Sequence, residues 1–84
     1  MDAKVYALLT SLRNDVAELM DYGHERHEDL NEAARLILTI MRECERGGLV
    51  TLSMPTFQRI AHLAAIGTAM LRIEDLEKEI GEGL

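Results

Sequence analysis

The sequence predicts an all-α protein, either an antiparallel helical hairpin or a three-helix bundle, built from residues 1–84 as a single helical domain. Apolar residues recur at steps of three and four over most of the chain, which is the spacing of helices that bury one face. Helix-breaking residues are few, with one proline and six glycines. A chain of 84 residues forms one domain at most, which excludes barrel enzymes and dinucleotide-binding folds.

The first predicted helix covers residues 2–22, where the apolar spacing continues without interruption. A polar run follows that contains Gly23, and a glycine in the left-handed conformation commonly ends a helix. The alternative is one continuous helix over 2–46, because the apolar stripe can be traced through Gly23 and His27. The break is favoured, since a glycine inside a helix costs about 1 kcal/mol relative to alanine.

The second predicted helix covers residues 30–46. Asp29 marks its start, because Glu32 follows three residues later in the pattern of a capping box. Its apolar residues cover about 200° of a helical wheel, about twice the arc that one buried face needs. We therefore expect this helix to be covered on more than one side.

The third predicted helix covers residues 54–80. The turn before it is clear, because Gly47 or Gly48 can end the second helix and Ser53 can cap the third. A link of about seven residues predicts that the two helices are antiparallel neighbours.

The 54–80 helix carries apolar residues on two sides. In a chain this short, such a helix indicates a second copy, so we expect a homodimer. The alternative is a monomer that uses both stripes internally. The first stripe, expected to close the monomer, is Phe57, Ile60, Ala64, Gly67 and Leu71, and the second, expected to meet the partner, is His62, Ile66, Ala69, Ile73, Leu76 and Ile80.

Charge and motifs limit the chemistry. Fifteen acidic against nine basic residues give a net charge of −6, which disfavours nucleic acid as a partner. No phosphate loop, nucleophile elbow or metalloprotease motif occurs, so we expect no catalytic activity. The single cysteine, Cys44, cannot form an intrachain disulfide and lies on the apolar side of its helix, where thiols pack. This use of cysteine is typical of the reducing cytoplasm.

One group of residues resembles metal ligands: His24, His27 and Glu28 share a helix face. A metal site in a bundle needs such groups on several facing helices, and the sequence offers no second set. The favoured interpretation is a solvated hinge, so we expect no metal and no cofactor.

A basic line on the 30–46 helix supports the alternative of a nucleic-acid-binding helical dimer. The favoured interpretation is a solvated, salt-bridged face, because three glutamates lie close enough to pair with the arginines. The basic line is Arg35, Arg42 and Arg46, and the expected partners are Glu32, Glu43 and Glu45.

No membrane segment is predicted. The stretch 63–71 is nearly free of charge but far shorter than the roughly 20 residues that span a bilayer. The N-terminus has no basic region followed by a long apolar run, so we expect no signal peptide and a cytoplasmic protein.

In size, acidity and helical pattern, the chain resembles the small helical-hairpin dimers of bacteria and their phages. These include plasmid copy-number regulators, anti-activators of transcription factors and anti-defence inhibitors, and the resemblance implies a regulator or inhibitor. From the residues we expect a non-enzymatic protein that binds itself and an unidentified protein target through helix faces. The alternatives are the nucleic-acid-binding dimer and a structural, self-assembling subunit. The expected partner or dimer interface is Leu8, Leu12, Val16, Ile66, Ala69, Met70, Ile73, Leu76 and Ile80.

Overall fold

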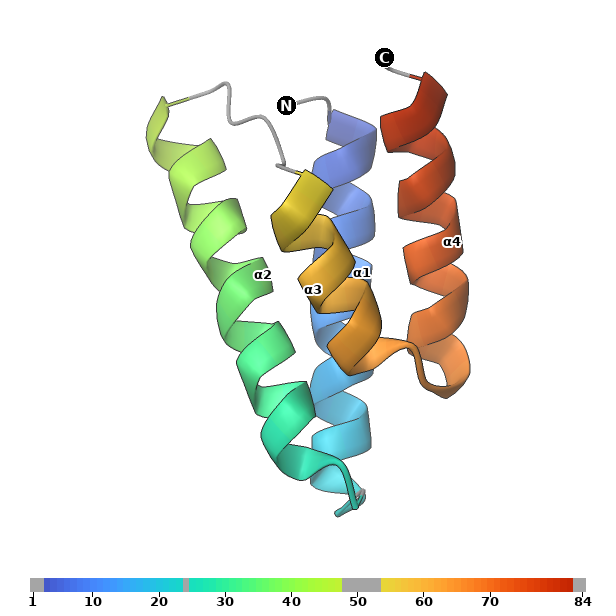
Figure 1. The fold of residues 1–84 in the computed structure, drawn as a ribbon. Helices are drawn as coiled ribbons and strands as arrows, with labels where there is room; N and C mark the ends of the chain where they lie inside the picture. The colour runs from blue at the N-terminus through green and yellow to red at the C-terminus, as the bar shows by residue number, and fades with distance from the viewer. Residues whose placement is uncertain (1–2, 24, 48–53, 83–84) are drawn as a thin grey trace.

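The computed structural model describes residues 3–23, 25–47 and 54–82. These residues form four helices that run alternately down and up, and the described ranges contain no strand (Figure 1). The all-α prediction is therefore confirmed. The helices are α1 (Ala3–Asp21), α2 (His27–Gly47), α3 (Met54–Ala64) and α4 (Gly67–Glu82).

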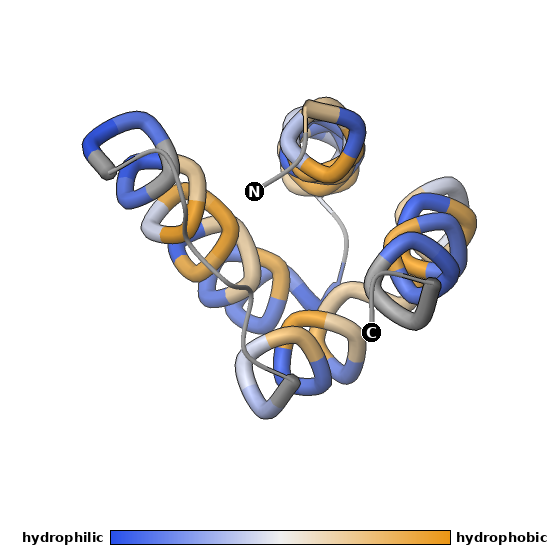
Figure 2. The backbone as a smooth tube through the Cα atoms, turned by 90° about the horizontal axis from the view of Figure 1, so that it is seen from above, coloured by the Kyte–Doolittle hydropathy of each residue, from blue (hydrophilic) through white to orange (hydrophobic). Residues whose placement is uncertain are grey.

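The helices surround one apolar interior. α1 packs against both α2 and α4, α2 packs against α1 and α3, and the contact between α3 and α4 is smaller. Figure 2 shows the hydrophobic side of each helix turned toward this interior. The core consists of Val5, Leu9, Leu12 and Val16 from α1, Leu30, Ala33, Ile37, Ile40 and Met41 from α2, Phe57, Ile60, Leu63 and Ala64 from α3, and Ala69, Ile73 and Leu76 from α4.

The wide apolar arc of α2 follows from this arrangement. α2 lies between α1 and α3, so both of its flanks are covered in addition to its inner face. Leu36 and Ala34, on the two flanks, are half-buried against the core, whereas Ile37 is fully buried. The expectation that this helix needs cover on more than one side is met within the chain.

The predicted break at Gly23 is confirmed. Gly23 has a φ of 69°, and its N–H donates to the carbonyl of Met20 at 3.0 Å. A left-handed residue just past the last turn, with this bond back into the helix, is a common helix ending. The alternative of one continuous helix over 2–46 is wrong.

The start of the second helix differs from the prediction. α2 begins at His27, and the first helical bond runs from the N–H of Leu30 to the carbonyl of Arg26 at 3.0 Å. Asp29 is therefore inside the first turn, and its predicted role as the capping residue is wrong. Its carboxylate instead accepts a hydrogen bond from Nε of Arg26 at 3.2 Å, and its negative charge is favourable at this end of a helix.

α2 ends and α3 begins where the glycines and the proline predicted. α2 ends at Gly47 and α3 begins at Met54, and the two helices are antiparallel neighbours (Figure 1). The capping roles predicted for Gly48 and Ser53 fall outside the described residues. Pro55 lies in the first turn of α3, where its missing N–H leaves no helical bond unmade.

The prediction of one continuous helix over residues 54–80 is wrong, because α3 ends at Ala64 and a separate helix, α4, begins at Gly67. The N–H of Ile66 donates to the carbonyl of Ala64 at 2.8 Å, which closes a three-residue turn. Gly67 has a φ of 52°, and the carbonyl of Ile66 then accepts the N–H of Ala69 at 3.1 Å to begin α4.

This second turn brings both predicted stripes to the same interior. Phe57 and Ile60 of α3 belonged to the first stripe, and Ile73 and Leu76 of α4 to the second; all four are buried in one core. In a straight helix these residues would point to different sides. A second copy was expected to cover the second apolar stripe. Because the chain folds back at Gly67, other helices of the same chain cover Ile73 and Leu76 instead.

Candidate functional site

The turn at Gly67 also decides which of the predicted interface residues reach the surface. Most of them do not, so their predicted role as an exposed contact surface is wrong for this fold. The side chains that instead form the interior of the chain are Leu12, Val16, Ala69, Ile73 and Leu76.

The remaining predicted interface residues divide into three groups. Leu8 and Ile66 are half-buried and pack against the core. Met70 is 43 % exposed. Ile80 lies in α4, but its side chain is outside the described part of the structure. Among the members of this set whose side chains are described, Met70 is the most exposed.

Two exposed apolar side chains were not expected. Tyr22 is 80 % exposed just after α1, and Leu71 is 58 % exposed in the second turn of α4. Leu71 was predicted to close the monomer, which is wrong because α4 turns its other side to the core. A helical wheel that is restarted at Gly67 would have found this exposed position.

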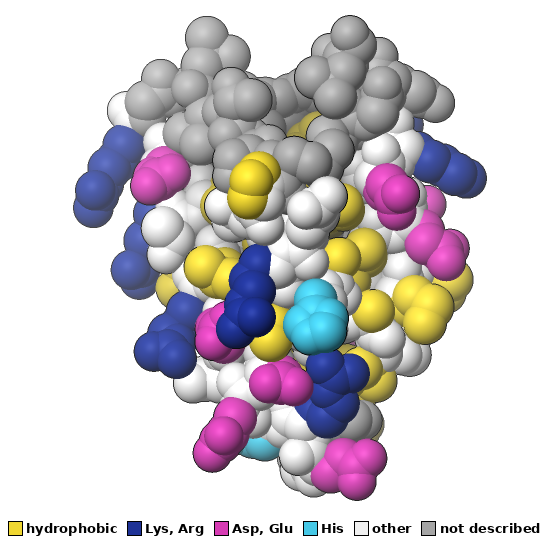
Figure 3. Space-filling view, in the orientation of Figure 1, with side chains coloured by type: hydrophobic (Ala, Val, Ile, Leu, Met, Phe, Trp, Pro, Cys, Tyr) yellow, Lys and Arg dark blue, Asp and Glu magenta, His cyan; other side chains and the backbone are white. Residues whose placement is uncertain are grey.

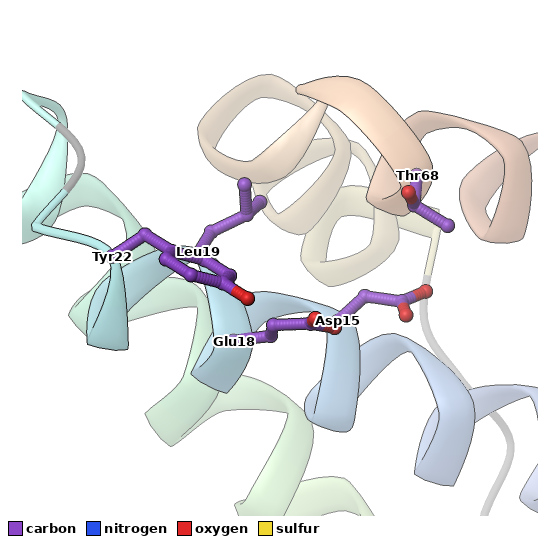
Figure 4. A pocket seen from close by; sticks show the side chains of 5 residues that line it. All are labelled: Asp15, Glu18, Leu19, Tyr22 and Thr68. Atoms are coloured by element: carbon purple, nitrogen blue, oxygen red, sulfur yellow. The ribbon is translucent and has the colours of Figure 1, made fainter.

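A shallow pocket lies between the end of α1 and the start of α4. It has a volume of about 180 Å³ and is lined by Asp15, Glu18, Leu19, Tyr22 and Thr68. Figure 4 shows Tyr22, Glu18 and Asp15 in succession along α1, with Thr68 of α4 across from Asp15. The sequence did not indicate this pocket, because its walls come from two helices far apart in the chain.

An ion pair beside the pocket joins these two helices. Nε of Arg72 lies 3.3 Å from Oδ2 of Asp15, and the Asp15 side chain is 15 % exposed. Both atoms are enclosed and neither makes a hydrogen bond of good geometry. At the opposite end of the same helix pair, Nζ of Lys4 lies 2.7 Å from Oε1 of Glu79. The two pairs fix the alignment of α1 against α4.

Two of the glutamates expected to neutralise the basic line are engaged elsewhere. Nε of Arg59, on α3, donates to Oε2 of Glu32 at 2.8 Å, and the Tyr6 hydroxyl donates to Oε1 of Glu45 at 2.5 Å. The hydrogen bond and the charge of Glu32 raise the pKa of Arg59 above its usual value, so Arg59 stays charged.

The arginine row, defined as Arg35, Arg42 and Arg46, is therefore left without carboxylate partners. All three side chains are exposed on α2, and none forms an ion pair with any residue in 3–23, 25–47 or 54–82. Figure 3 shows Lys and Arg side chains along the α2 edge, whereas hydrophobic side chains gather over α3 and α4. The predicted salt-bridged face is wrong for this row.

The described residues do not assemble the other candidate sites, which are the predicted metal-ligand group and Cys44. His27 and Glu28 are exposed at the start of α2, and His24 lies outside the described residues. Within the described ranges, no three His, Cys, Asp or Glu side chains are grouped to hold a metal ion. The side chain of Cys44 is also outside the described part. No helix of the described chain has the length and apolarity needed to cross a membrane.

Comparison with protein families, with curated proteins and with solved structures gives no significant match for this chain. The class of the protein is therefore defined by its fold, in which the described residues form four helices.

Proposed function

We propose that this chain is a non-enzymatic, cytoplasmic regulatory protein that binds another protein and modulates or inhibits it. The contact lies where α1 ends and α4 begins, on a surface that we call the α1–α4 end surface, formed by Tyr22, Thr68, Met70 and Leu71. The regulator of bacterial or phage type expected from the sequence belongs to this proposal, as does a homodimer.

The observation that carries this proposal is the position of the exposed large apolar side chains. Within the described residues these are Tyr22, which follows the last residue of α1, and Met70 and Leu71, which lie in the first two turns of α4. Tyr22 shares a pocket with Thr68, and Leu71 lies one helical turn beyond Thr68. Aromatic and methionine side chains are enriched in protein contacts, and this composition is what supports the proposal.

Leu71→Asp tests the proposal. It places a charge where an apolar anchor would be desolvated, so we expect it to abolish capture of the partner while the helical circular dichroism is unchanged. Partners are trapped in cells through a photo-crosslinking amino acid at position 22 and identified by mass spectrometry. Ala7→Asp makes the same charge change at an exposed position of α1 and is the matched control. The same captured proteins with Leu71→Asp as with the unchanged chain would contradict the proposal.

The arginine row supports a second candidate function, the nucleic-acid-binding protein. Three exposed arginines without carboxylate partners, in a chain of net charge −6, are positioned to contact phosphates. This function predicts that binding to RNA or duplex DNA falls steeply with salt and that replacing the row by glutamines removes it. Binding that is absent at low salt, or unchanged by the substitutions, would exclude it.

A further inference from the structure

The pocket at the α1–α4 end surface has the chemistry of a site for one basic side chain. We propose that it takes the guanidinium group of an arginine from the partner protein, held between the Tyr22 ring and the Glu18 carboxylate. The source of the arginine rests on the proposed function, whereas the preference of the pocket for a guanidinium group does not.

The charge in the pocket favours a cation. Of its two carboxylates, Asp15 is already paired with Arg72, whereas Glu18 is exposed and pairs with no described residue. α1 has no basic residue in its last turn, so nothing of its own offsets the negative end of the helix dipole. A cation in the pocket would therefore meet the Glu18 carboxylate and the negative end of the α1 dipole.

The apolar walls select among cations. The Tyr22 ring is 80 % exposed and offers a face on which a planar guanidinium group can stack. Leu19 is half-buried beside it and can contact the alkyl part of a long side chain. The carboxylate of Glu18 can accept two parallel hydrogen bonds from a guanidinium group, which an ammonium group cannot supply in that geometry. These features favour arginine over lysine.

The size of the pocket fits a single side chain. Its volume of about 180 Å³ is below the roughly 300–1,000 Å³ of pockets that enclose drug-sized molecules. Leu71 is exposed one turn beyond Thr68, so an apolar residue next to the arginine in the partner would have a contact of its own. The fitting partner is a segment that combines an arginine with an apolar side chain.

The experiment uses the full chain and N-acetyl-arginine methylamide as the probe, followed by two-dimensional amide NMR. The matched ligand is the citrulline analogue, which has the same length and shape but no charge. We expect the arginine probe to shift the amides of Leu19, Tyr22 and Thr68, with an affinity at least about fivefold higher than that of the citrulline analogue. Equal shifts from both ligands, or shifts scattered over all acidic residues, would overturn the inference.

Variants locate the site. Glu18→Gln and Tyr22→Ala should each weaken binding of the arginine probe at least about threefold. Glu74→Gln removes a charge at an exposed position of α4 and should leave binding unchanged. An equal loss with Glu74→Gln would show attraction by net charge and overturn the pocket.

The two proposals can fail separately. If the arginine probe does not bind but Leu71→Asp still abolishes partner capture, the proposed function stands and this inference falls. If the probe binds as expected but partner capture is insensitive to Leu71→Asp, the pocket is supported and the proposed function falls.

Discussion

The two glycine turns of this protein have similar backbones and very different surroundings. Gly23 and Gly67 have φ values of 69° and 52°, and at both positions an added Cβ would meet no atom within 4 Å. The glycine is thus needed for its backbone conformation and not for space. Gly23 follows the polar end of α1, whereas Gly67 lies inside the apolar run 63–71. A turn can therefore form inside an apolar run when both flanking segments bury their faces in the same core.

Arg26 connects the two turns. It lies just after the Gly23 turn, and its Nη2 donates to the carbonyls of His62 and Leu63 at 3.2 and 3.5 Å. These carbonyls belong to the last turn of α3, which ends at the second turn. A cation at the carboxyl end of a helix is favourable both as a hydrogen-bond donor and in the field of the helix dipole. The polar first turn thus stabilises the end of the helix that precedes the apolar second turn.

The largest expected effect tests whether the Gly67 turn buries the stripe on α4. Leu76 is fully buried and Leu71 is 58 % exposed. In a straight 54–80 helix, Leu71 would lie on the stripe expected to close the monomer and Leu76 on the stripe expected to meet the partner. We expect Leu76→Ala to lower the free energy of unfolding by about 2–5 kcal/mol, and Leu71→Ala to change it by no more than about 0.5 kcal/mol. Urea unfolding followed by circular dichroism measures both. Equal effects would mean that α4 is not turned as described.

Replacing each of the two glycines by alanine should have different effects on stability and self-association. Gly23→Ala and Gly67→Ala each force a left-handed alanine, which costs about 1–2 kcal/mol. At Gly67 the flanking residues also form helix readily, so the chain can instead join α3 and α4 into one helix. The joined helix exposes the α4 stripe, which a second copy can cover. We expect Gly67→Ala to cause self-association that increases with protein concentration. Gly23→Ala should lower the free energy of unfolding without causing self-association.

Light scattering over a range of concentrations measures this difference. Gly67→D-Ala, made by chemical synthesis, is the control, because a D-residue adopts positive φ without strain and should leave the mass unchanged. The same increase in mass with Gly23→Ala as with Gly67→Ala would show that the two turns do not differ in this respect.

The smallest expected effect concerns the link between the turns. Arg26→Gln removes the charged donor to the end of α3, so we expect a loss of about 1 kcal/mol and faster hydrogen exchange at the amides of Ile66 and Ala69. Arg35→Gln removes an exposed arginine that has no ion pair among the described residues, and it should change neither quantity. Unchanged exchange in Arg26→Gln would show that the turns are independent.

The row of arginines illustrates a limit of local spacing. Glu32 and Glu45 are close enough along α2 to pair with this row, yet they bind Arg59 of α3 and Tyr6 of α1 instead. Side chains on a helix flank choose between neighbours on their own helix and neighbours on the next one. Only the packing of α2 between α1 and α3 decides that choice.

The sequence by itself determined the helical class, the break at Gly23 and the antiparallel turn between Gly47 and Met54, because apolar spacing and helix-ending residues act within a few positions. The tertiary structure alone decided that the 54–80 segment folds back at Gly67, and with it which apolar residues are core and which are surface. The physical reason is that the local conformational preferences of residues 63–71 are similar for a continuous helix and for a turn. Burial of both flanking stripes in one interior favours the turn.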